Sequence, residues 1–96
     1  MIGHIVLFKF KNENKVQNME KAKEMLLGLE DTIDVLEHIE VGINFDQAER
    51  AMDMSIYSLF ENKENLNIYA CHPAHLEVVD FIKSVTEYSK VCDYIV

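Results

Sequence analysis

The first segment of the chain, IGHIVLFKF at residues 2–10, limits the possible folds more than any other feature. Its β-branched and aromatic residues predict a strand. Because side chains alternate along a strand, Val6 and Phe8 would lie on one face and Leu7 on the other. Both faces are therefore apolar. Two later segments repeat this property, so the sheet needs cover on both sides: MDMSIYSLF at 52–60 and KVCDYIV at 90–96.

The remaining segments predict three helices and one more strand. Apolar residues recur at steps of three and four from residue 19 to residue 33, the stripe of an amphipathic helix. Residues 35–44 alternate as a strand. The short polar loop FDQAER joins this strand to the next one, which favours an antiparallel hairpin.

Pro73, the only proline, predicts a break between the last two helices. A helix capped by Asn62 must end near Cys71, because the residue before a proline is disfavoured in the helical conformation. Pro73 then suits the first turn of the following helix. The expected buried stripe of that helix consists of Leu76, Val79, Ile82 and Val85.

The resulting order, βαββααβ, predicts an α+β, ferredoxin-like fold with a four-stranded antiparallel sheet. At 96 residues the chain forms one domain, residues 1–96. In this topology the helices lie on a single face of the sheet. The other apolar face has no cover within one chain, so we expect a homodimer that packs sheet against sheet. A monomer with an exposed apolar face is the alternative.

Charge and composition argue against several classes of partner. The formal net charge is -8 and the nine basic residues are scattered, which disfavours nucleic acid and anionic membrane surfaces. The longest apolar run is far too short to span a bilayer, and the chain starts directly with a strand pattern, so we expect a cytoplasmic protein. Cys71 and Cys92 have no metal-binding or redox spacing and are expected as thiols.

The stretch YACHPAHLEVVDF at residues 69–81 holds the candidate reactive residues. Tyr69 and His75 flank the break, which can bring them together. His4 shares a strand face with the residues that the broken helix crosses. We therefore expect one pocket between the sheet and the broken helix, with Tyr69 and His75 as reactive groups. The expected binding residues are His4, Phe8, Met54, Leu66, His72 and Leu76.

Each candidate also has a structural interpretation. Tyr69 can pack a helix against the sheet, His72 can cap the new helix, and His4 can be a hydrogen-bonded core histidine. A metal site would need a closed set of ligands, and none is apparent, so we expect neither metal nor cofactor. The residues of that alternative are His4, His72, His75 and Asp53.

The stretches GHIVLFKFK, VGIN, MDMSIYSLFENKENLNIYACHPAH and VCDYIV together resemble the stress-responsive dimeric α/β barrel, or Dabb, domain family. The most specific part runs from Asp53 through Tyr69 to the HPAH motif that ends at His75. The resemblance covers essentially the whole chain. It implies a homodimer whose two ferredoxin-like sheets pack into a shared barrel.

A distant similarity to olivetolic acid cyclase, an enzyme of this family, implies roles for three residues. By motif match, Tyr69 and His75 are the catalytic pair of an aldol ring closure, and His4 lines the pocket. Such a closure needs a base to remove a proton between two carbonyls and a donor to hold the oxyanion. Imidazole and phenol suit these two roles near neutral pH.

Three functions stay open at this point. The first is a stress-associated protein whose pocket holds a small, largely apolar molecule. The second is a cofactor-independent lyase or cyclase that acts on a carbonyl-rich, polyketide-like substrate. The third, by analogy of fold, is a monooxygenase-like protein. An enzyme needs a cavity reached by both the Tyr69 hydroxyl and a His75 nitrogen, whereas a binding protein can bury both groups.

Overall fold

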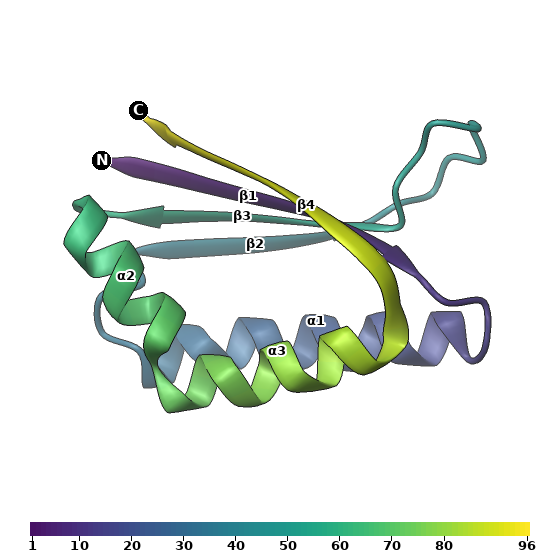
Figure 1. The fold of residues 1–96 in the computed structure, drawn as a ribbon, viewed down its shortest axis with the longest axis horizontal. Helices are drawn as coiled ribbons and strands as arrows, with labels where there is room; N and C mark the ends of the chain where they lie inside the picture. The colour runs from purple at the N-terminus through teal and green to yellow at the C-terminus, as the bar shows by residue number, and fades with distance from the viewer.

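The computed structural model describes residues 1–96 as two layers, a four-stranded antiparallel sheet with all helices on one face (Figure 1). The strand order across the sheet is β2-β3-β1-β4. The predicted βαββααβ order and ferredoxin-like fold are confirmed. None of the helices combines the length and the apolar character that a membrane span requires. The elements are β1 (Ile2–Phe10), α1 (Lys15–Thr32), β2 (His38–Ile43), β3 (Met54–Phe60), α2 (Lys63–Cys71), α3 (Pro73–Val85) and β4 (Thr86–Ile95).

The predicted break between α2 and α3 occurs at His72. Asn62 caps α2, where its side chain accepts a hydrogen bond from the Asn65 N–H at 2.8 Å. His72 has an extended backbone, and its Nδ1 accepts a hydrogen bond from the Ala74 N–H at 3.1 Å. Pro73 follows as the first residue of α3, where its missing N–H removes no helical bond. The two helices therefore meet at an angle (Figure 1).

The core lies between the helices and one face of the sheet. The predicted stripe of α1 is confirmed, since its members are all buried. They pack against the alternate residues of β1, β2 and β3 that face the same way. The largest fully buried side chains are Tyr69, Phe10, Phe60, Leu26, Ile33 and Met54.

The opposite face of the sheet carries apolar side chains and no helix. Cross-strand pairing places Ile5 between Tyr57 and Cys92 on this face. Leu7 is 37% exposed and Tyr94 39% exposed. Every residue of β4 after Thr86 is exposed as well. A single chain therefore leaves the second apolar face of its sheet uncovered.

The structure differs from the sequence prediction at the end of the chain. β4 begins at Thr86, directly after α3, and not at residue 90. In α3 the buried residues are Val78 and Ile82, while Leu76 is 51% exposed. The line of contact is rotated because α3 packs against α1 as well as beneath the sheet. Ala74, Val78 and Ile82 are spaced four residues apart and face the space between α1 and the sheet.

Candidate functional site

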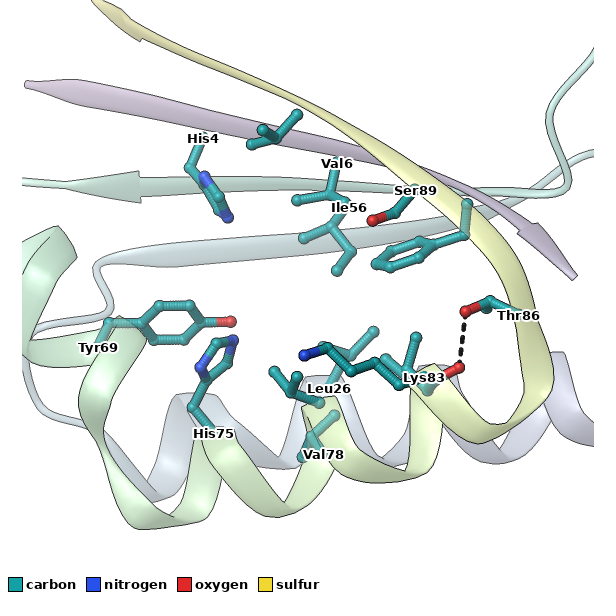
Figure 2. Close-up of a pocket in the computed structure, with 14 residues that line it drawn as sticks. His4, Val6, Leu26, Ile56, Tyr69, His75, Val78, Lys83, Thr86 and Ser89 are labelled. Atoms are coloured by element: carbon teal, nitrogen blue, oxygen red, sulfur yellow. Dashed lines mark hydrogen bonds between the residues drawn. The ribbon is translucent and has the colours of Figure 1, made fainter.

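A cavity lies between the helix-facing side of the sheet and α3 (Figure 2). Its volume is about 260 Å³, slightly below the range of roughly 300–1,000 Å³ that is usual for drug-sized ligands. Most of the lining is hydrophobic, so the cavity suits a small and largely apolar molecule. The lining residues are His4, Val6, Phe8, Leu26, Ile56, Tyr69, His75, Val78, Val79, Ile82, Lys83, Thr86, Ser89 and Val91.

Tyr69 lies near the end of α2 and is only 2% exposed. Its ring packs against Phe60, with 4.9 Å between ring centroids. The Tyr69 hydroxyl has no hydrogen-bond partner in the chain. Every side-chain oxygen and nitrogen that is fully buried does have a partner, so the Tyr69 hydroxyl oxygen is not fully buried. The hydroxyl oxygen therefore opens onto the cavity, toward which it points in Figure 2. Burial raises the pKa of Tyr69 to about 12, so the phenol stays a hydrogen-bond donor at neutral pH.

His75 lies in the first turn of α3, and the break in the chain sets its orientation. Ala70 is in the last turn of α2, where backbone carbonyls have no helical partner. The His75 ring lies with Nδ1 at 3.1 Å from this Ala70 carbonyl oxygen. Because a carbonyl can only accept, Nδ1 carries the proton and donates it. The neutral ring therefore keeps its lone pair on Nε2.

The His75 ring lies beside the Tyr69 ring, with 4.2 Å between centroids and 40° between planes. The pKa of His75 is lowered, chiefly because burial disfavours the charged ring. The hydrogen bond to Ala70 opposes this effect, and the nearby His4 and His72 add to it. At neutral pH His75 is thus an uncharged imidazole that can accept a proton.

His4 approaches the same pair from β1. Its ring is edge-on to Tyr69, with centroids 6.5 Å apart. Asp93, the cross-strand partner of His4 on β4, hydrogen-bonds to Nδ1 of its ring. The carboxylate holds this edge of the ring, and the ring itself points toward Tyr69 and His75 (Figure 2). The consecutive helices α2 and α3 thus supply a proton donor and a proton acceptor to one wall, and the distant strand β1 adds a second imidazole.

The structure brings four of the eight candidate residues together in the cavity: His4, Phe8, Tyr69 and His75. The other four do not line it. Met54 lies on the same face of β3 as Ile56, two residues earlier, and is buried in the core. Ile56 lines the cavity instead. Leu66 borders a separate depression with Ile2 and Ile95.

The remaining two candidates lie at the break. His72 uses its ring nitrogen as the cap of α3. Leu76 directly follows His75, so it points to a different side of the helix and is half exposed. None of these four residues lines the cavity, so their predicted binding position is corrected. Depth along β3 keeps Met54 in the core, the rotation of α3 turns Leu76 away, and His72 takes the capping role that was its alternative.

The main residue that sequence reasoning missed is Lys83. It lies four residues after Val79 and eight after His75, so all three share one side of α3. That helical spacing was the available signal. Ser89, on the first half of β4, was missed because the strand was expected to begin later.

The residues of the metal alternative do not gather in one place. No group of three or more His, Cys, Asp or Glu side chains is close enough to hold an ion. Asp53 accepts a hydrogen bond from the Phe10 N–H at 2.7 Å and lies 3.5 Å from Nζ of Lys15. Its carboxylate therefore ties β1 and α1 to the start of β3.

Comparison with known proteins identifies the family to which this chain is similar. A family model described as Stress responsive A/B Barrel Domain matches residues 2–96. The chain is 32% identical to the stress-response A/B barrel domain-containing protein DABB1 of Arabidopsis thaliana. That similarity covers 99% of this chain and 47% of DABB1, so the chain spans about half the length of this relative.

Solved structures with the same fold include two informative examples. A dimeric protein of unknown function and ferredoxin-like fold from Bacteroides fragilis superposes with a TM-score of 0.91 at 32% identity, covering 99% of this chain and 95% of that one. Hydroxynitrile lyase from Passiflora edulis superposes with a TM-score of 0.88 at 18% identity, covering 99% and 92% of the two chains. The second likeness concerns the fold alone.

Proposed function

This chain belongs to the stress responsive A/B barrel domain family, and we propose that its cavity binds a small, largely apolar carbonyl compound and moves a proton on it. His75 is the base and Tyr69 the hydrogen-bond donor. His4, held by Asp93, is a further polar group at the same wall. The corresponding reaction class is that of a lyase or cyclase that uses only these side chains.

One observation carries this proposal. The Ala70 carbonyl holds the proton of His75 on Nδ1, which leaves Nε2 as an acceptor next to a tyrosine whose hydroxyl has no protein partner. A purely structural pair would be expected to satisfy these groups with each other or with the backbone. Here both keep unused capacity beside an apolar cavity.

The chemistry follows from the two groups. Nε2 of neutral His75 takes a proton from the carbon next to the carbonyl, and the electron pair moves into the carbonyl to give an enolate and an imidazolium. The Tyr69 hydroxyl donates a hydrogen bond to the enolate oxygen where negative charge develops. The enolate carbon can then attack a second carbonyl, and the alkoxide so formed takes the proton back from the His75 imidazolium; otherwise the imidazolium returns the proton to the enolate carbon. Breaking a bond next to a carbonyl uses the same two groups in reverse.

We also propose that the protein acts as a homodimer. The bare apolar sheet face supports this, as does the dimeric state of the Bacteroides fragilis protein at 32% identity. Because the cavity opens between the sheet and the helices, pairing through the opposite face leaves it accessible. The partner would cover residues such as Leu7 and Tyr94.

The test is hydrogen exchange of 2-heptanone in D₂O, followed by loss of the proton NMR signals next to its carbonyl. The wild-type protein should accelerate exchange. Tyr69→Phe and His75→Gln should each lower the protein-dependent rate by about 100-fold or more, the range of general acid–base catalysis. Tyr88→Phe, which removes a hydroxyl on the opposite face of the sheet from the cavity, serves as the control. If the protein binds the ketone without accelerating hydrogen exchange, proton transfer is contradicted and the protein is a binding protein without this activity.

A further inference from the structure

Lys83 is the one side chain in the cavity wall that carries a permanent charge at neutral pH. It extends from the last turn of α3, and Figure 2 shows its ammonium directed into the cavity, on the side of Tyr69 and His75. The carboxylates that form the chain's ion pairs are Asp53, Asp93 and Glu40, and none of them pairs with Lys83. Lys83 is exposed, so its ammonium lies where the largely apolar cavity opens to solvent, with no carboxylate partner.

The groups around Lys83 add a donor and no negative charge. None of the lining residues is Asp or Glu. The Thr86 hydroxyl is already used, since it donates to the Ile82 carbonyl at 2.8 Å. The Ser89 hydroxyl lies on the strand above and points into the cavity without a partner in the chain (Figure 2). In a protein of net charge -8, the lining thus supplies one ammonium and no carboxylate, and the nearby Asp93 is already paired with His4.

We propose that the ligand is an oxo acid, with its carboxylate bound by Lys83 and Ser89 and its ketone carbonyl at Tyr69. This inference rests on the proposed function and names the substrate class. A single ammonium and one hydroxyl match the charge and acceptors of a carboxylate. A phosphate dianion carries two negative charges, whereas the lining supplies a single ammonium to compensate them. The apolar walls would hold the carbon chain between the two polar groups.

Matched ligands separate the carboxylate from the carbonyl. The probes are 4-oxopentanoate, 5-oxohexanoate and 6-oxoheptanoate, each compared with its methyl ester, so that only the charge differs. Binding is measured by NMR titration of the ¹⁵N-labelled full chain. The best acid should bind wild-type protein about tenfold more tightly than its ester, as is reasonable for one charge-assisted contact. Added salt should weaken binding of the acid and leave the ester unaffected.

Variants then assign the preference to Lys83. Lys83→Gln should bring the acid and the ester to within about twofold of each other while the affinity of the ester is retained. Lys83→Glu should make the ester the better ligand. Lys63→Gln removes the same charge from an exposed position at the start of α2 and should keep the full preference.

Two results would overturn the inference. One is equal affinity of acid and ester for the wild-type protein. The other is a preference for the acid that survives in Lys83→Gln. If esters bind and undergo exchange that depends on Tyr69 and His75, the proposed function stands although the oxo-acid class is wrong. If no member of either series binds, both proposals fall.

Discussion

The imidazole ring of His75 lies 4.2 Å from the phenol ring of Tyr69, centroid to centroid, although the two residues belong to different helices. In one continuous helix, residues six apart would point about 120° away from each other and lie nearly two turns apart along the axis. The break at Pro73 removes that constraint and frees the Ala70 carbonyl, which then fixes the proton of His75. One local feature thus creates both the proximity and the protonation state on which the proposed chemistry depends.

The lowered pKa of His75 predicts the acidic limb of the rate profile. Proton abstraction needs the neutral ring, so the rate should rise with pH through a pKa below the usual 6.5 and level off by neutral pH. The Tyr69 donor is lost only near pH 12, far above that limb. The measurement is 2-heptanone exchange from about pH 4 to 9. A rising limb centred above 6.5 would contradict the assignment of His75 as the base.

The same shift predicts a pH dependence of stability. Because folding lowers the pKa of His75, the unfolded chain binds the proton more readily, and the contribution of this group to stability is fully present above pH 6.5. It is lost as the pH falls through the lower, folded value. Urea unfolding should therefore show that wild-type protein loses more stability below pH 6.5 than His75→Gln does. Identical losses would mean that His75 titrates normally in the folded state.

Removing the Tyr69 hydroxyl should separate chemistry from stability. The hydroxyl has no partner in the chain, so Tyr69→Phe leaves no donor or acceptor unpaired. The free energy of unfolding should stay within about 0.5 kcal/mol of the wild-type value, while ketone exchange falls. Urea denaturation monitored by circular dichroism provides the first quantity. A large loss of stability would show that the hydroxyl has a structural role instead.

A charge on the bare sheet face should prevent dimer formation. Leu7 lies on that face and is 37% exposed in a single chain. Burying an aspartate there without a partner costs several kcal/mol, so Leu7→Asp should yield monomer or unfolded chain. Light scattering after size-exclusion chromatography measures the mass. Val16→Asp, which places the same charge on an exposed apolar residue of α1, should remain dimeric. A monomeric wild-type protein at micromolar concentration would refute the dimer.

Gly28 should be a site where stability can be gained. It lies inside α1, and a Cβ added there would meet nothing within 4 Å. Gly28→Ala should therefore stabilise the fold by about 0.5–1 kcal/mol through its effect on the backbone. Gly3→Ala is the contrasting variant, because its Cβ would lie 2.6 Å from the Tyr94 ring and should destabilise the fold. Thermal and urea unfolding of both variants give the sign of the change in the free energy of unfolding.

Local patterns in the sequence were sufficient to predict the architecture. The strand that is apolar on both faces, the stripe of α1 and the proline between two helices each depend on neighbours a few residues away. These features predicted the element order, the break at His72 and the uncovered sheet face. They also marked Tyr69 and His75 as neighbours, because the consequence of Pro73 for the backbone is local.

The composition of the cavity was decided by tertiary packing. His4 meets Asp93 across 89 positions of sequence, and no local rule relates them. The rotation of α3 turned Leu76 away from the cavity and placed Lys83 at its wall, because the helix packs against α1 and the sheet together. On β3, the position along the strand decides that Ile56 lines the cavity and that Met54 lies in the core. Periodicity fixes which face a residue takes, whereas the fitting of whole elements against each other determines which residues on that face reach a common space.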